Sequence, residues 1–363
     1  MSLSDTPRQL GFRMPAEWEP HEATWLAWPH NPEDWPGKFS SIPWIYAEIV
    51  RLLAERERVH LVVEDAKTQS RVTGMLRRAH ANLDNVSFHA WPTDRGWTRD
   101  SGPIFVRNAE GQVALTNWQF NAWAKYEDWQ LDDQLPSRVN ELLSLTEWQP
   151  ALALPDGVQH RVVLEGGSID VNGAGMMLTT EECLLSDVQQ RNPGLTREQL
   201  EQVFSDYLGI DQVIWLGRGI AGDDTHGHVD DIARFAGPDT IVAAVEPNTK
   251  DPNHEPLAEN LARMKAARTP QGKQFTIVEL PMPRPIVFRK QRVPASYANF
   301  YLANGVVLMP TFHDPNDRVA LNILAEAFPD REVIGVHSVD LIWGLGALHC
   351  MTQQQPAAGV ARP

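Results

Sequence analysis

Residues 196–216 read TREQLEQVFSDYLGIDQVIWL, a helix signal followed directly by a strand signal. Thr196, with Gln199 three residues later, forms a capping box that opens a helix. Gly209 is the residue type that most often ends one. The apolar run at 212–216 is rich in residues that favour strands. This stretch therefore predicts one helix-and-strand unit of an α/β fold.

Similar signals recur from end to end, and a helix-bearing unit returns about every 60–70 residues, about five times in all. Further strands are predicted at 24–28, 59–63, 103–106, 161–164, 240–245, 274–280, 305–309 and 331–336, and further helices at 41–55, 66–79, 255–267 and 316–328. Because no Gly/Ser linker or charge block divides the chain, we expect one domain over 1–363, with short flexible tails at about 1–10 and 357–363.

Composition excludes several classes of protein. The chain has 363 residues, of which 42% are hydrophobic, enough for a sizeable core. Its net charge of −15 argues against a nucleic-acid partner and fits either a small cationic substrate or solubility alone. No apolar run approaches the roughly 20 residues that span a bilayer, and the start lacks signal-peptide features, so no membrane partner is expected. Two distant cysteines do not form a disulfide framework, which favours a reducing cytoplasm.

Three polar clusters lie where strands are predicted to end or begin: WTRDSGP at 97–103, LEGGS at 164–168 and GDDTHGHVDD at 222–231. Functional residues are usually held at such places. On an extended segment His228 and Asp230 would share one face, which places an imidazole and a carboxylate in the same pocket. A solvated acidic turn explains the same motif equally well.

Each cluster also has a plainer interpretation. Arg99 and Asp100 could form a structural ion pair, and the glycines after Glu165 could serve a tight turn. A metal site formed by His226, His228 and Asp230 is the alternative from another class of protein. That run is similar to the His-x-His-x-Asp-His motif of metallo-β-lactamase-type hydrolases, but position 231 is Asp rather than the final His.

The two cysteines differ in setting. Cys350 lies in GLGALHCMTQQQP at 344–356, after a glycine-punctuated apolar run, which suits a nucleophile. Cys183 lies among apolar residues and is expected to be a small buried hydrophobe without a catalytic role. His349 is expected to be structural, because adjacent residues on a strand point in opposite directions.

Taken together, these motifs resemble a known family. The matching pieces are MPAEWEPH at 14–21, WTRDSGP at 97–103, EGG at 165–167, HGHVDD at 226–231, RVPASYANFY at 292–301 and HCMTQQQP at 349–356. In this order they resemble the agmatine deiminase and bacterial (Porphyromonas-type) peptidylarginine deiminase family of the guanidine-modifying, or pentein, superfamily. The likeness covers nearly the whole chain.

The resemblance implies a fold and a set of site residues. The fold is a five-bladed α/β propeller, in which pseudo-fivefold ββαβ units surround one central pocket. Carried over motif by motif, the catalytic residues are Cys350, His228, Glu165, Asp230 and Asp100.

It also implies the chemistry. Asp100 and Asp230 clamp a guanidinium, and Cys350 attacks its central carbon as a thiolate. His228, oriented by Glu165, first donates a proton to the leaving ammonia and then activates water. No metal or other cofactor is required.

Agmatine is the expected substrate, with N-carbamoylputrescine and ammonia as products in putrescine biosynthesis. Peptidyl arginine and free arginine are the alternatives. Trp97 is the candidate wall for the substrate's aliphatic stem, or else a core aromatic. Family members carry a glycine-richer run before the His-Cys pair, whereas this chain has Leu345 and Ala347 there, which affects the pocket for the substrate's tail. A homodimer is implied by the resemblance alone. How an acidic pocket ionises Cys350 stays open.

Overall fold

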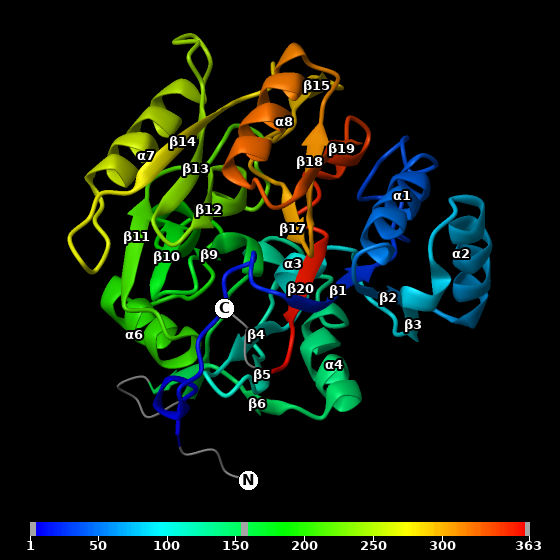
Figure 1. The fold of residues 1–363 in the computed structure, drawn as a ribbon, viewed down its shortest axis with the longest axis horizontal. Coiled ribbons are helices and arrows are strands. Elements are labelled where there is room, and N and C mark those ends of the chain that lie inside the picture. The colour runs from blue at the N-terminus through cyan, green and yellow to red at the C-terminus, as the bar shows by residue number, and fades with distance from the viewer. Residues whose placement is uncertain (1–4, 154–158, 360–363) are drawn as a thin grey trace.

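The structure is a computed structural model that describes residues 5–153 and 159–359. Within these residues the chain forms five sheets of three or four strands, with helices at the periphery (Figure 1). Two short hairpins accompany them, β7 Ala151–Ala153 with β8 Gln159–Arg161 and β15 Val287–Phe288 with β16 Gln291–Arg292. No helix in the described part of the chain is long and apolar enough to cross a membrane.

Four of the sheets follow one plan. An inner strand pairs antiparallel with a middle strand, a helix follows, and an outer strand then pairs parallel with the middle one. The strands are β4 Ile104–Arg107, β5 Val113–Thr116 and β6 Thr146–Trp148; β9 Asp170–Val171, β10 Met176–Thr180 and β11 Gln212–Leu216; β12 Ala233–Gly237, β13 Thr240–Val245 and β14 Thr276–Pro281; β17 Tyr301–Ala303, β18 Val306–Thr311 and β19 Glu332–His337.

The fifth sheet joins the two ends of the chain. Its inner strand, β20 Thr352–Pro356, pairs antiparallel with β1 His21–Ala27, so that Trp25 lies opposite Gln353. Parallel strands β2 Arg58–Val63 and β3 Val86–Ala90 complete it. The C-terminal strand thus closes the unit that the N-terminal strand begins, and in Figure 1 the five units lie around a centre occupied by β20 and α3.

The helices that link middle and outer strands are α1 Ile42–Ala54, α4 Leu135–Leu143, α5 Glu181–Leu184, α6 Arg197–Leu208, α7 His254–Ala266 and α8 Pro315–Ala327. Helix α2 Ala66–Arg78 links β2 to β3, and α3 Thr98–Ser101 is a single turn before β4. The capping box of Thr196 and Gln199 is present, and Gly209 ends α6 with a left-handed φ of 70°. Because the cap residues satisfy free backbone groups, the local sequence alone sets the bounds of this helix.

The α/β class and the fivefold ββαβ repetition agree with the expectations from sequence. The strand expected at 161–164 is wrong, because β8 ends at Arg161 and Val163 makes only an isolated bridge to Gln119. Several inner and middle strands carry little signal of their own, being short and flanked by polar loops. Of the expected tails, residues 1–4 and 360–363 lie outside the described residues, whereas Arg8 donates to Ser205 Oγ at 2.8 Å and Gly359 N to Gly111 O at 2.9 Å.

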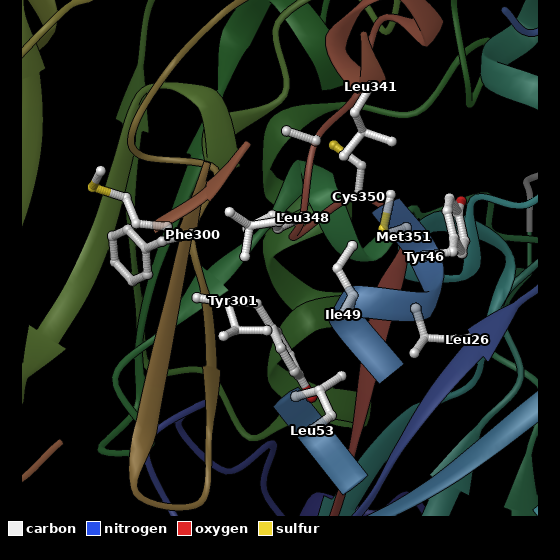
Figure 2. Packing of buried hydrophobic residues seen from close by; sticks show 14 of the residues in the cluster. Leu26, Tyr46, Ile49, Leu53, Phe300, Tyr301, Leu341, Leu348, Cys350 and Met351 are labelled. Carbon is white, nitrogen blue, oxygen red and sulfur yellow. The ribbon is translucent and has the colours of Figure 1, made fainter. Parts of the chain in front are cut away.

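In the largest apolar cluster, α1 packs against the unit of β1 and β2 and against the unit of β17 to β19 (Figure 2). Ile49 and Leu53 of α1 share it with Tyr301 of β17 and with Leu348. Figure 2 shows the Cys350 side chain in the same cluster, with Leu341 and Met351 near it. The turn before β20, which carries Cys350, therefore packs against this cluster.

A buried ionic network crosses the centre beside that cluster. Glu17 Oε2 receives Arg234 Nη2 at 2.5 Å and lies 2.8 Å from His349 Nε2, and Glu17 Oε1 accepts Leu302 N at 2.7 Å. Burial alone would raise the pKa of Glu17, but Arg234 and His349 outweigh it and hold that pKa well below its usual range. One carboxylate thus connects the N-terminal segment to the three units whose inner strands are β12, β17 and β20.

We therefore expect Glu17→Gln to lower the free energy of unfolding by about 3–5 kcal/mol, because it leaves buried Arg234 without its full counter-charge. Denaturant unfolding measures this. Since the pKa is lower in the folded state, the stabilisation is present above the ordinary carboxylate pKa and declines as pH falls. The control is Glu48→Gln, which removes an exposed pair with Arg51 and should cost at most about 1 kcal/mol. Equal losses in the two variants would contradict the central role of Glu17.

Candidate active site

Each of the five units supplies a polar side chain to one buried cluster, always from the turn just before its inner strand. Asp100 precedes β4, Glu165 precedes β9, His228 and Asp230 precede β12, Asn299 precedes β17, and Cys350 precedes β20. All are nearly inaccessible to solvent. The site is thus built by repetition: five equivalent turns meet at the centre of the molecule.

Cys350 lies where this cluster meets a cavity of about 430 Å³. Its Sγ is 3.1 Å from Asn299 Nδ2 and 3.7 Å from Asp230 Oδ2. Burial raises the pKa of the Cys350 thiol well above its usual range, and Asp230, Asp231 and Asp100 raise it further. Left to these groups alone, the sulfur would stay a thiol at neutral pH.

His228 lies between two carboxylates. Its Nδ1 is 3.8 Å from Asp100 Oδ1, and its Nε2 is 3.6 Å from Glu165 Oε2. Burial alone would lower the pKa of His228, but the charge of Asp100, with contributions from Cys183 and Glu165, raises it well above its usual range. The imidazole is therefore protonated at neutral pH and can act as an acid.

Glu165 is held ionised. Its Oε1 receives Arg191 Nε at 3.0 Å, and both side chains are fully buried. Burial by itself would raise the pKa of Glu165, but Arg191 and His228 outweigh it and lower the pKa to about 2. A permanent negative charge thus faces His228 and keeps it protonated.

The two candidate clamps differ in how their oxygens are occupied. Asp100 accepts Gly167 N at 3.0 Å and Trp123 Nε1 at 2.9 Å, and burial raises its pKa to about 6; His228 opposes this shift, while Asp230 and Glu165 add to it. Oδ2 of Asp230 lies 2.7 Å from His349 Nδ1. Its Oδ1 has no hydrogen-bond partner among the described residues.

Three other buried polar atoms of the site resemble Asp230 Oδ1 in this respect. Glu165 Oε2 and both ring nitrogens of His228 lack a hydrogen-bond partner within the described ranges. Buried polar groups are rarely left unpaired, and such groups at a cavity mark a place for a ligand. Gly167 keeps this place open: a Cβ there would lie 2.6 Å from His228 Nδ1 and 2.8 Å from Asp100 Oδ1. The unpartnered carboxylate oxygens of Asp230 and Glu165 are acceptors, and a planar group rich in N–H donors fits them.

The cavity that leads to Cys350 is walled by aromatic side chains and acidic at its mouth. Trp97, Trp123 and Trp343 line it together with Leu345. Four carboxylates also line it, those of Glu33, Asp34, Asp128 and Asp224. Arg95 Nη1 pairs with Asp34 at 2.5 Å, while its Nη2 pairs with Asp128 at 3.0 Å, and Lys125 pairs with Asp224. Acidic side chains outnumber basic ones, so the mouth favours a cation.

The site is less well suited to binding a metal ion than to binding a planar cation. In the described residues one group of possible ligands lies together, Glu165, Cys183 and His228, with one ligand atom from each within 4.8 Å of the others. Arg191 already occupies one oxygen of Glu165. In the metal site expected from the sequence, His226 turns away from His228 and Asp230, with its Nε2 3.2 Å from Ser186 Oγ.

The structure brings together all the residues expected from sequence: Cys350, His228, Glu165, Asp230, Asp100 and Trp97. The alternative that Arg99 pairs with Asp100 is wrong, since Arg99 Nη2 lies 3.7 Å from Glu17 instead. Cys183 is buried as expected, but it lies beside His228.

Sequence reasoning missed Asn299 and Trp123. Asn299 has a detectable signal, because it precedes an inner strand as the other site residues do. Trp123 has none, since it reaches Asp100 only through three consecutive left-handed residues, Ala122 to Ala124.

Comparison with known proteins agrees with this arrangement. The model of the family described as Porphyromonas-type peptidyl-arginine deiminase matches residues 13–356. A protein named agmatine deiminase from Pseudomonas syringae pv. tomato is 36% identical over 379 residues, covering 98% of both chains. One of the same name from Ectopseudomonas mendocina is 34% identical with the same coverage.

Solved structures show the same likeness. The agmatine deiminase of Enterococcus faecalis superposes with a TM-score of 0.88 at 31% identity and 98% coverage of both chains. A putative arginine deiminase from Porphyromonas gingivalis gives 0.83 at 33% identity, covering 96% of this chain and 99% of its own. From the ordered motifs, the fivefold architecture and these matches, we conclude that the chain belongs to the family of Porphyromonas-type peptidyl-arginine deiminases.

Proposed function

We propose that this protein hydrolyses agmatine to N-carbamoylputrescine and ammonia through a covalent amidino-cysteine intermediate. The observation that carries the proposal is the meeting of the Cys350 thiol and the protonated His228 with carboxylate oxygens that lack partners, in one buried site. Its support from outside the site is the family itself and the agmatine deiminases related over the whole chain.

Binding follows from the free acceptors. A guanidinium is planar, carries a positive charge at neutral pH and presents N–H donors at its edge. Asp230 Oδ1 and the carboxylate of Asp100 accept these donors, which holds the central carbon near Cys350 Sγ. Trp97 is the wall along which the aliphatic stem lies, since it lines the cavity beside the thiol.

The first half-reaction forms a bond from sulfur to the guanidinium carbon. The thiolate of Cys350 attacks, and the C–N π electrons move onto nitrogen. The proton of His228 passes to one terminal nitrogen, the C–N bond breaks, and ammonia leaves. An amidino group is then linked to the sulfur through a thioether.

The second half-reaction consumes water. His228, now neutral, removes a proton from water as its oxygen bonds to the amidino carbon, and the C–S bond then breaks to return the thiolate. The product carries a ureido group in place of the guanidinium. Glu165 stabilises the protonated form of His228 in both halves.

The acidic mouth favours agmatine over its competitors. The ammonium at the far end of agmatine matches the surplus of carboxylates there. The α-carboxylate of free arginine would meet like charge, and peptidyl arginine carries no charge at that position. A homodimer and a cytoplasmic location remain predictions from the sequence.

Cys350→Ala should abolish ammonia release while agmatine still binds, because only the nucleophile is lost. Turnover is measured as ammonia release from agmatine, arginine and an arginyl peptide, and binding by calorimetry. Agmatine should be turned over fastest by the wild-type enzyme. Turnover by Cys350→Ala would refute the covalent route, and a preference for the peptide would move the substrate to the runner-up. Activity lost on chelation and restored by zinc would support a metallohydrolase instead.

The acid side of the pH profile should report Asp100. Because burial raises the pKa of Asp100 to about 6, the clamp loses its charge below that pH, and kcat/KM should fall about tenfold per pH unit. Asp34, whose pKa burial also raises to about 6, is the competing assignment. Asp34→Asn should keep the decline and Asp100→Asn should lack it. The reverse pattern would assign the decline to the mouth of the cavity.

Gly167→Ala should reduce kcat/KM about 100-fold or more, since the added methyl group enters the space between His228 and the clamps. The matched control is Gly74→Ala in α2, where a Cβ meets no atom within 4 Å. That variant should keep full activity and gain about 0.5–1 kcal/mol of stability. Full activity in Gly167→Ala would show that the guanidinium binds elsewhere.

A further inference from the structure

The acidic site poses a problem for its own nucleophile. The charged and titratable groups that face Cys350 are Asp230 and Asp231 from the turn before β12, Asp100 from α3 and the hydroxyl of Tyr46 from α1. The carboxylates oppose a negative charge on sulfur. The backbone N–H of Ala347 opposes this effect, and the bound cation offsets it only while substrate is present. The net direction still disfavours the thiolate, so a further donor at the sulfur is needed.

Asn299 is the side chain that provides one. Its Nδ2 lies 3.1 Å from Cys350 Sγ and 3.0 Å from Asp231 Oδ1. The asparagine is 1% exposed and comes from the turn before β17, at the position equivalent to those of the other site residues. Its amide is thus held inside the site, against the reacting atom.

The hydrogen bonds at the other end of the amide fix which atom faces the sulfur. Asn299 Oδ1 accepts His349 N at 3.0 Å and Cys350 N at 3.5 Å. A flipped amide would turn its oxygen toward the carboxylate of Asp231 and its NH₂ toward two N–H groups, so that only a weak S–H donation from Cys350 would remain. The N–H donor must therefore point at Cys350.

We propose that Asn299 is a catalytic residue whose side-chain N–H stabilises the Cys350 thiolate. The proposal rests on the deiminase function above and names what makes its nucleophile. As a thiol, the sulfur can donate to Asp230 Oδ2 at 3.7 Å. When its proton leaves to water in the cavity, the sulfur becomes an acceptor, and the amide of Asn299 is already in place. Asn299 itself gains and loses no proton.

Asn299→Asp tests this donor. The variant keeps an oxygen for His349 N and Cys350 N but replaces the NH₂ group by a second oxygen. The rate of Cys350 alkylation is followed against pH, with peptide mass spectrometry to separate it from Cys183. Loss of a hydrogen bond to a charged group should move the midpoint upward by about 1–2 pH units. Any charge on the new carboxyl acts in the same direction, so the signal of the native amide, described below, separates the two causes. At neutral pH kcat should fall at least tenfold and partly recover at higher pH.

The control is Asn260→Asp in α7. Asn260 is equally buried, and it bonds Gly217 N at 2.7 Å and Arg218 O at 2.8 Å, away from the site. It should leave the alkylation midpoint unchanged. A folded Asn299→Asp with an unchanged midpoint would overturn the proposal even if its activity fell, because the asparagine would then only brace the turn.

The unmodified enzyme gives a second test that does not depend on a variant folding. With ¹⁵N-labelled asparagine, the side-chain NH₂ signal of Asn299 should shift with the same midpoint as Cys350 alkylation. That shift should vanish in Cys350→Ala. An NH₂ signal insensitive to the ionisation of Cys350 would overturn the proposal. If the NH₂ signal shifts with the midpoint of Cys350 alkylation but no guanidine releases ammonia, the donor is established and the deiminase function is refuted.

Discussion

The carboxylate of Glu17 connects the fold to the site. It lies outside the five site turns, yet it contacts Arg234 from β12, His349 from the turn before β20 and Leu302 N from β17. His349 then carries the constraint onward, because its other nitrogen contacts Asp230 at 2.7 Å. With a carboxylate at each ring nitrogen, the imidazole cannot rotate without losing both contacts. The position of Asp230, the proposed substrate clamp, is therefore set by the same interaction that joins three units of the fold, which explains why a buried charge is kept here at the cost of its desolvation.

Electrostatics divides the site into fixed and free parts. Arg191 holds one oxygen of Glu165, and backbone and indole N–H groups hold both oxygens of Asp100. These contacts orient the acceptors before any ligand arrives, so that little reorganisation is left for the reaction. The free atoms, Asp230 Oδ1 and Glu165 Oε2 among them, are those on which a cation can act. An acidic pocket that attracts the substrate and opposes the thiolate needs a neutral donor at the sulfur, because a cationic side chain there would compete with the guanidinium.

Sequence alone predicts the parts of this protein that depend on local rules. The bounds of α6 follow from its capping box and from Gly209, and the runs that form β11 and β13 are apolar enough to be identified as they stand. The motif residues are recoverable because the chemistry demands particular side chains in each turn. The inner strand β9 has only two residues and owes its place to pairing with β10, so no local pattern marks it. The contacts of Trp123 and of the Glu17 network cannot be predicted from the sequence for the same reason. Their partners are distant in the chain, and only the closed ring of units brings them together.

Backbone strain is present in the wall of the cavity at Leu345. Leu345 has a φ of 68°, in the left-handed region where glycine is favoured, and it lines the cavity between Gly344 and Gly346. Neither neighbour can supply a side chain, because a Cβ on Gly344 would meet Trp35 at 2.4 Å and one on Gly346 would meet Trp97 at 2.7 Å. A glycine at 345 would remove a strain of about 1–3 kcal/mol and leave the aromatic wall intact. The leucine is thus costly to the backbone and adds apolar surface to the cavity wall, while it also packs against the largest apolar cluster.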